Sequence, residues 1–310
     1  MGGPSILISA FAAVLAGLAI AAGGVLQQKA ASRRPSGERM SIRLMARLVA
    51  DRVWLLGIGL AVVSYGFQAI ALTFGPLTLV QPLIVSELLF AVPVSVRLRK
   101  LRLRPRDWGA ILSVVAGLTV GIVAADPGKG NPVQPITMWA PAIGGVAVLS
   151  IACVVAARWL TGPTKSSAFA LSGACTMALQ SALYAATLAL LRQRGWGLFL
   201  TWEPYVLVAA SLAGMFLIQN AFESGPLAAS TPVIDAVLPL VAIALGVGLF
   251  GEPVRTSLWG LGGAGLGIVL LLVGIVALDT SPVVRKEQRL EQKEKEETKQ
   301  QEDVQEQQAQ

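Results

Sequence analysis

The chain has 310 residues, of which 54% are hydrophobic and 14% charged, and its mean hydropathy is +0.66. Soluble domains carry about 25% charged residues, so this composition excludes an ordinary soluble protein and favours apolar spans in a lipid bilayer. There is no histidine, which removes the commonest general base and metal ligand. The two cysteines, Cys153 and Cys175, stand alone in apolar runs and are interpreted as packing residues.

Nine apolar segments are long enough to cross a bilayer. A chain in hydrocarbon must satisfy its backbone hydrogen bonds internally, so each span is predicted to be a helix of about 20 residues. The predicted spans are residues 5–26, 53–74, 76–96, 108–125, 138–157, 167–191, 204–222, 226–250 and 257–278. All seven tryptophans lie at or just beyond a predicted span end, as expected of aromatic side chains at the membrane interfaces. The predicted fold class is therefore all-α integral membrane.

The first span could be mistaken for a signal peptide. It has no basic segment before it, and it is longer than the apolar part of a signal peptide, so it is predicted to be a retained helix.

Lysine and arginine are distributed unevenly between the connections. If these alternate between two sides, one side holds 21 of the 25 basic residues. The other side holds four: Lys129, Arg192, Arg194 and Arg255. Because the basic side faces the cytoplasm, the N-terminus is predicted outside the cell and the C-terminus inside, for a multi-pass protein of the plasma membrane.

Three polar segments lie on the predicted cytoplasmic side. Residues 40–52 are predicted to form an amphipathic helix on anionic lipid, and the basic run 97–106 is interpreted as a topology anchor rather than a nucleic-acid site. Residues 280–310 are a charged tail with too few apolar residues to bury a core, predicted to be disordered or a solvated helix. Residues 1–279 form the predicted transmembrane domain.

The sequence resembles itself at an offset of 150 residues. Residues 75–82, Gly-Pro-Leu-Thr-Leu-Val-Gln-Pro, align with residues 225–232, Gly-Pro-Leu-Ala-Ala-Ser-Thr-Pro. In each segment a tight Gly-Pro turn begins a span that contains a second proline, Pro82 or Pro232. That proline frees a backbone carbonyl inside the membrane, which is tolerated where protein or a cavity surrounds it.

The repeated spans are five positions apart along the chain. Five is odd, so the two copies are predicted to enter the membrane in opposite directions, as in many secondary transporters. The sequence thus predicts two inverted repeats, about residues 5–126 with four helices and about residues 138–279 with five.

The repeated segments also resemble a known family. Gly75-Pro-Leu, Gly225-Pro-Leu, the stretch Gln219-Asn-Ala-Phe222 and the stretch Leu249-Phe-Gly-Glu-Pro253 look like the drug/metabolite transporter superfamily, and most like its EamA-like and NIPA-type magnesium transporter branches. The resemblance covers about residues 5–279 and implies a secondary transporter. Members usually have two five-helix repeats, so it implies that the leading helix of the first repeat is missing here. The superfamily carries diverse solutes, and fold does not fix the substrate.

Two acidic residues lie near the middle of spans. Glu87 is the twelfth residue of its span and Asp235 the tenth of its own, and no basic residue lies at similar depth. Ionisable groups at this depth are costly, so both are predicted to form the site for a transported cation or a coupled proton. The alternative is that each is protonated and stabilises helix packing.

Other polar residues inside spans are predicted either to line the pathway or to join helices. They are Thr78, Gln81, Thr231, Gln68, Tyr65, Gln180, Tyr184, Gln219 and Asn220. Glu252 lies near Arg255, and a structural ion pair or a helix-end role is predicted for it.

One apparent nucleotide motif is rejected. Residues 260–265 satisfy the G-x-G-x-x-G pattern, but that pattern requires a preceding strand, and here it opens an apolar span. The spacing of Gly263 and Gly267 instead predicts close helix packing. The sequence shows no nucleotide loop, metal-ligand cluster or nucleophile–base pair, so no cofactor and no enzyme activity are predicted.

The predicted function is secondary transport of a small solute or cation by alternating access, at a midplane cavity between inverted repeats. One alternative is a magnesium-type divalent cation transporter or facilitator, since carboxylate oxygens suit hard cations. Another is a non-transporting membrane scaffold, which would not need the two buried acids. The predicted partners are the lipid bilayer and the solute, with no nucleic acid, and a homodimer is left open.

Overall fold

The apolar segments become helices, because a helix satisfies its own backbone hydrogen bonds in hydrocarbon. A computed structural model describes residues 3–31, 51–98, 104–225 and 227–282. Within these ranges there is no strand. The helices are α1 (Gly3–Ala31), α3 (Arg52–Phe74), α4 (Leu77–Ile84), α5 (Glu87–Leu98), α6 (Pro105–Ala125), α7 (Ile136–Ala156), α8 (Gly162–Arg194), η2 (Gly195–Leu200), α9 (Glu203–Ser224), α10 (Leu227–Gly248) and α11 (Leu258–Asp279). The predicted amphipathic segment lies outside the described residues except for its last two, as does the tail from residue 283.

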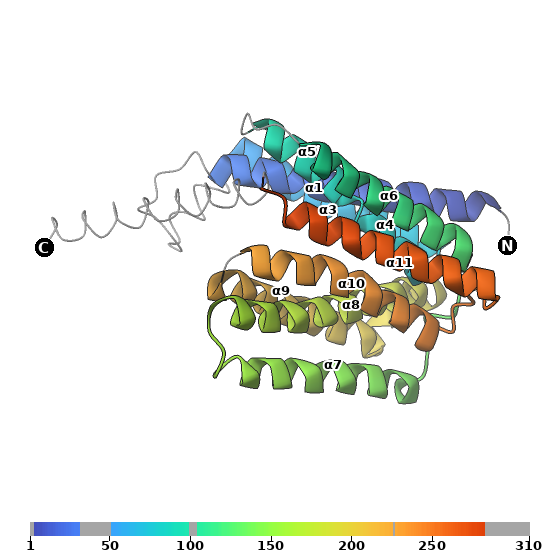
Figure 1. The fold of residues 1–310 in the computed structure, drawn as a ribbon. Helices are drawn as coiled ribbons and strands as arrows, with labels where there is room; N and C mark the ends of the chain where they lie inside the picture. The colour runs from blue at the N-terminus through green and yellow to red at the C-terminus, as the bar shows by residue number, and fades with distance from the viewer. Residues whose placement is uncertain (1–2, 32–50, 99–103, 226, 283–310) are drawn as a thin grey trace, which may run out of the picture.

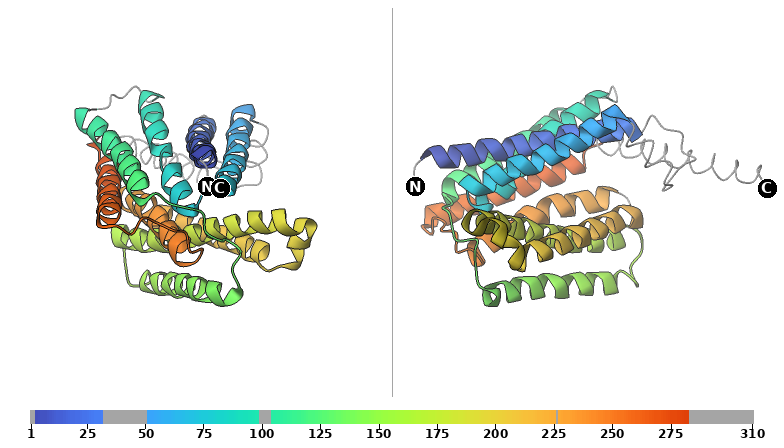
Figure 2. Two further views of the ribbon diagram at one scale, coloured as in Figure 1. Left: turned by 90° about the vertical axis from the view of Figure 1, so that its right-hand side faces the viewer. Right: turned by 180° about the vertical axis from the view of Figure 1, so that it is seen from behind.

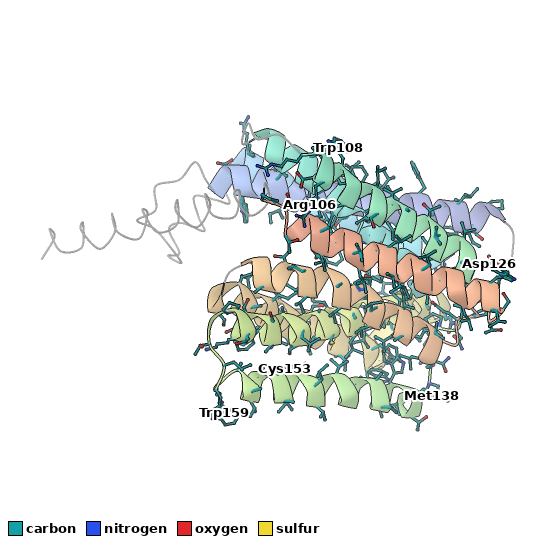
Figure 3. The ribbon with its side chains drawn as sticks, viewed as in Figure 1. Arg106, Trp108, Asp126, Met138, Cys153 and Trp159 are labelled. Atoms are coloured by element: carbon teal, nitrogen blue, oxygen red, sulfur yellow. The ribbon has the colours of Figure 1, made fainter. Side chains whose placement is uncertain are left out.

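Among the described residues, eight helices are long and apolar enough to cross a membrane, as expected of a multi-pass membrane protein. They are α1, α3, α6, α7, α8, α9, α10 and α11, and each matches a predicted span to within five residues at either end. When α4 and α5 are taken together as one segment, successive helices run in alternating directions, as α6 does toward Asp126 and α7 from Met138 toward Trp159 (Figure 3). The end of the bundle at which α1 begins and α6 ends is called the Lys129 end below, and α11 finishes at the opposite end (Figure 1).

The helices form two groups (Figures 1 and 2). One contains α1, α3, α5, α6 and α11, and the other contains α7, α8, α9 and α10. Helix α8 is the centre of the second group, with 72% of its most apolar stretch buried, whereas α7 packs mainly on α8 and has only 6% of its own apolar stretch buried. The large core cluster joins α8 to the α3–α4 region through contacts such as those of Ala178 and Leu183 with Leu77 and Val80.

The remaining predicted span, residues 76–96, is interrupted. It forms α4 and α5, with the residues between them, Val85 and Ser86, in a turn. There the amide of Val85 donates to the carbonyl of Pro82 at 3.2 Å, three residues back instead of four. The continuous helix predicted for this span is therefore wrong, because Pro82 has no N–H to continue the ladder and the next turn tightens.

One backbone contact occurs in both halves of the chain. The Ser9 hydroxyl on α1 donates to the carbonyl of Ala71 on α3 at 2.9 Å, and the Ser166 hydroxyl on α8 donates to the carbonyl of Ala221 on α9 at 2.7 Å. Ala71 and Ala221 each lie four residues before the glycine that ends their helix. A Cβ atom on Gly75 would overlap Ser9, and one on Gly225 would lie 2.9 Å from the Cβ of Ser166. Helix α1 thus packs on α3 as α8 packs on α9.

The predicted glycine contact is confirmed on α11. A Cβ atom on Gly267 would lie 2.3 Å from the Cα of Gly121, and one on Gly263 would lie 2.5 Å from the Cβ of Ala124. Both partners are on α6, so the glycines let the two helix backbones approach closely.

Trp139 departs from the predicted interfacial belt. Its side chain is fully buried, edge-on to the rings of Trp202 at 5.6 Å and Phe250 at 5.8 Å. It lies at the start of α7 as predicted, but there the starts of α7 and α9 and the end of α10 meet and enclose it. In contrast, Trp196 and Trp259 are about 90% exposed.

Candidate functional site

A cavity of about 240 Å³ opens at the Lys129 end, between the α3–α4 turn and the last turns of α8. Its apolar lining comes mainly from these two regions and from Phe250. The polar side chains that line it are Thr73, Lys129, Arg192, Gln193 and Glu252. The cavity is therefore formed by both halves of the chain and combines an apolar wall with charged groups, as small-molecule sites commonly do.

The two basic residues that line the cavity both contact the last turn of α3. The Lys129 ammonium donates to the carbonyl of Thr73, and the guanidinium of Arg192 lies 5.8 Å from the centre of the Phe74 ring. Partial burial and the neighbouring positive charge of Arg192 lower the pKa of Lys129. Neither cation forms an ion pair among the residues that the structure describes.

Glu252 closes the cavity on its inner side by binding the start of α4. The backbone amides of Leu77 and Thr78 donate to its two carboxylate oxygens at 2.6 and 2.9 Å. These amides have no partner within α4, and the helix dipole favours an anion there. Glu252 therefore does have a helix-end role, but at the start of α4, which is 174 residues away in the chain, and not at the end of the helix that it follows. Burial raises the pKa of Glu252, against the opposing effect of these amide hydrogen bonds.

Arg255 has a different acidic partner from the one that sequence proximity indicates. Its guanidinium pairs with Asp126 at 2.8 Å, and its amide donates to the carbonyl of Ala125 at 2.8 Å. Nearby, the amide of Gly128 donates to the carbonyl of Pro253 at 2.8 Å. The loops after α6 and α10 are therefore bonded to each other, which joins the two halves at the Lys129 end.

Glu87 lies at the interruption of the spanning segment. It is the first residue of α5 and is partly buried. Gly17 of α1 packs against this point, since a Cβ atom there would lie 2.9 Å from the carbonyl oxygen of Ile84 and 3.1 Å from the amide nitrogen of Glu87. The hydroxyl of Ser86 is buried and has no hydrogen-bond partner among the residues that the structure describes. An acid, an orphaned hydroxyl and irregular backbone therefore meet at one place in the membrane.

Asp235 lies in the middle of α10, between Pro232 and Pro239, and is partly buried, as is Thr231 one turn before it. Neither Glu87 nor Asp235 lines the cavity at the Lys129 end. Neither lines a second cavity of about 160 Å³, which lies between α4, α6, α10 and α11. That second cavity is apolar except for Thr78 and Arg255, so of the predicted pathway residues it receives only Thr78.

Two of the predicted polar residues are brought together across the halves. The Tyr184 hydroxyl on α8 donates to the carbonyl of Tyr65 on α3 at 3.0 Å, and their rings meet edge-on at 6.2 Å. Tyr184 lies one helical turn before Leu188, which lines the charged cavity. The tyrosine pair therefore lies on the same α3–α8 contact as the cavity, deeper in the bundle.

The remaining predicted polar residues are dispersed. Gln180 on α8 and Gln81 on α4 are buried, and within the described part of the chain the side-chain nitrogen of Gln81 has no hydrogen-bond partner. Gln68 on α3 is partly buried, Gln219 on α9 is exposed, and Asn220 donates to the carbonyl of Phe216 in its own helix at 2.8 Å.

Sequence reasoning did not select Lys129 or Arg192 as site residues. A signal was nevertheless present, because they are two of only four basic residues on the side that the positive-inside rule keeps poor in lysine and arginine. A basic residue on a side that is otherwise poor in them is a candidate for a specific role, and the structure places both Lys129 and Arg192 on one cavity.

Comparison with known proteins adds one relative. An uncharacterized protein of Corynebacterium glutamicum is 30% identical over 276 residues, which cover 88% of this chain and 94% of the relative. No protein-family model and no solved structure matches the chain. Because the match covers most of both chains, the chain belongs to the same family as this uncharacterized protein of Corynebacterium glutamicum.

Proposed function

We propose that this protein is a secondary transporter that moves a small solute or cation by alternating access between two inverted halves. The observation that carries the proposal is Glu87, which begins α5 at the break in a spanning segment, beside the orphaned hydroxyl of Ser86. Irregular backbone at membrane depth is found where it is enclosed by protein or lines a cavity, and transporters use such broken helices to bind ions. An acid there is suited to bind and release a proton or another cation as access alternates.

The packing of the two halves supports an inverted repeat. The Ser9 and Ser166 contacts pair α1 with α8, in addition to the pairing of α3 with α9 that the sequence repeat indicates. The close pairs α4–α10 and α6–α11 each contain one helix from either half, as expected near a pseudo-twofold axis. Helix α7 then has no counterpart in the first half, consistent with the predicted four helices followed by five.

The orientation and family are part of the same proposal. With the broken α4–α5 segment as a ninth crossing, the Lys129 end faces outward in the plasma membrane, the C-terminus is cytoplasmic, and the basic residues segregate 21 to four. The charged cavity is then an outer vestibule between the halves. The resemblance of the Gly75 and Gly225 turns to EamA-like and NIPA-type transporters points to the same mechanism.

Reconstituted protein tests the function. Liposomes that contain the purified protein and an internal pH-sensitive dye should acidify or alkalinise when the right solute is added, from a panel that includes Mg²⁺ and organic ions. Glu87→Gln keeps the shape of the side chain but removes its titratable charge, so we expect it to fold and to lose the coupled flux, and Asp235→Asn to weaken it. Glu297→Gln is the control, because Glu297 is an acid of the charged tail that follows the last predicted span. Equal flux in Glu87→Gln, Asp235→Asn and the parent protein would show that the buried acids are structural.

A further inference from the structure

Two cations at the Lys129 end have no acidic partner, although a third one does. Arg255 is paired with Asp126 at 2.8 Å. Lys129 and Arg192 line one cavity and form no ion pair in the described chain. The carboxylate of Glu252 lines the same cavity, but its two oxygens accept the amide hydrogens of α4.

Most of the hydrogen-bonding capacity of the two cations is unused. Lys129 has three donors, of which one is given to the carbonyl of Thr73. Arg192 has five, and its contact with the face of the Phe74 ring uses none of them. The amide of Gln193, also on the cavity, can add further donors.

The two like charges repel each other across a partly desolvated space. Repulsion between charges is weak in bulk water but several times stronger at a protein surface of lower dielectric. An anion placed between them replaces this repulsion with two attractions and forms charge-assisted hydrogen bonds with both. A purely structural role, in which the cations complement the carbonyl end of α3, accounts for Lys129 but requires neither a cavity nor the second cation.

We propose that the cavity at the Lys129 end binds an oxyanion, a carboxylate or phosphate group, between Lys129 and Arg192. This rests on the proposed function, since the occupant of an outer vestibule in a transporter is the carried solute, and it makes that solute an anion. A phospholipid headgroup carries the same chemistry as a free anion. The test therefore separates these two sources.

Thermal unfolding of the purified full-length protein measures the binding. In an uncharged detergent, the unfolding midpoint is followed against increasing phosphate, acetate or succinate, with sodium chloride at equal ionic strength as the reference. The same measurement is made in nanodiscs of phosphatidylcholine alone and of phosphatidylcholine with phosphatidylglycerol. Lys129→Gln and Arg192→Gln are compared with Arg194→Gln, which removes the same charge two residues further along and does not line the cavity.

We expect a free oxyanion to stabilise the protein selectively. Its affinity should fall roughly tenfold or more in Lys129→Gln and in Arg192→Gln, and should be unchanged in Arg194→Gln. Arg192→Gln alters no backbone contact, so it remains informative if Lys129→Gln folds poorly. An equal loss in Arg194→Gln, or no oxyanion effect above chloride, overturns the site. Stabilisation by phosphatidylglycerol alone also overturns it, because the occupant is then a headgroup and not a solute.

Liposome flux separates this inference from the proposed function. If the stabilising anion binds but is never transported, and no other solute is, the site stands and the transport function fails. If a cation or proton is carried and no oxyanion binds, the transport function stands and this site is wrong.

Discussion

The segment α4–α5 and the helix α10 begin with the same sequence pattern and end as different structures. Each follows a Gly-Pro turn and contains a proline seven residues after the glycine, Pro82 or Pro232. Helix α10 nevertheless runs unbroken from Leu227 to Gly248, whereas the first segment stops at Ile84 and restarts at Glu87. An internal proline is therefore not sufficient to interrupt a spanning helix here.

What differs is the surroundings of each segment. At its start α4 rests on the carboxylate of Glu252 from the other half, and at its end Gly17 of α1 packs on the exposed backbone. Both contacts come from elements far away in the sequence. The break between α4 and α5 therefore depends on tertiary contacts, and substitutions in other helices should weaken it.

Removal of the carboxylate beneath α4 should have the largest effect. Glu252→Ala leaves the amides of Leu77 and Thr78 buried without an acceptor, and each such group costs about 1–3 kcal/mol. We expect a loss of about 3 kcal/mol in the free energy of unfolding, measured in detergent by chemical or thermal denaturation.

Gly246 on α10 provides the control for this substitution. A Cβ atom there would lie 2.4 Å from the Oε2 atom of Glu252. Gly246→Ala should therefore destabilise the parent protein and cost much less in the Glu252→Ala background. Equal costs in the two backgrounds would mean that Glu252 does not occupy this position.

Closing the space beside the break should have the next largest effect. An exposed glycine in a helix is usually improved by alanine, by up to about 1 kcal/mol. At Gly17 the added carbon meets the carbonyl of Ile84 and the amide of Glu87, so Gly17→Ala should instead destabilise by about 1–3 kcal/mol.

Gly24 on the same helix makes the sign of this effect decisive. A Cβ atom there meets nothing within 4 Å, so Gly24→Ala should be neutral or stabilising. The two variants are compared by their unfolding midpoints in one detergent. If both shift in the same direction, α1 does not pack closely on the break.

The sequence predicted the features that depend on local residues and missed those that depend on tertiary contacts. Eight spans were predicted to within five residues, because each is fixed by a local requirement, a run of apolar residues long enough to cross the membrane. The close α6–α11 approach was also predictable, from the spacing of Gly263 and Gly267. The break was not, because Pro82 and Pro232 occupy equivalent positions in the repeat, and the contacts with Glu252 and Gly17 that distinguish the two segments come from distant parts of the chain.

The candidate site was predictable in kind rather than in position. Glu87 and Asp235 stand out because an acid inside a span is rare, but their depth does not tell which surface they face. The hydrogen bonds between Glu252 and the start of α4 join residues 174 positions apart, and the sequence around Glu252 indicated only a helix-end role without its partner. Trp139 was misassigned to the membrane interface, because a tryptophan at a helix end looks the same whether lipid or Phe250 lies beside it.

The two serine contacts test the correspondence of the halves directly. Ser9→Ala and Ser166→Ala each remove one hydroxyl that donates to a backbone carbonyl next to a Gly-Pro turn. Hydrogen bonds between membrane helices contribute about 0.6 kcal/mol on average, so each loss should be about 0.5–1 kcal/mol. Steric-trap or thermal unfolding should give similar values for both, with Ser211→Ala, whose hydroxyl binds within its own helix, as the control. Strongly unequal losses would argue that α1 and α8 are not equivalent.

A change of stability with pH isolates the charge of Glu252. This residue lies in the connection after α10, outside the spanning helices, and burial raises its pKa above the ordinary value of 4.5. The folded protein therefore keeps the proton at pH values where the unfolded chain has already released it. In that window the folded state binds more protons than the unfolded state, so its stability falls as the pH rises, by at most about 1.4 kcal/mol per pH unit for one group. Above the raised pKa the contribution is constant. Glu252→Gln has no proton to exchange, so the difference in unfolding midpoint between the parent protein and Glu252→Gln should move in favour of the variant from pH 4.5 upwards and then level off. A difference that stays constant with pH, or that moves in favour of the parent protein as the pH rises, would show that the amides of α4 outweigh burial and hold this carboxylate ionised throughout.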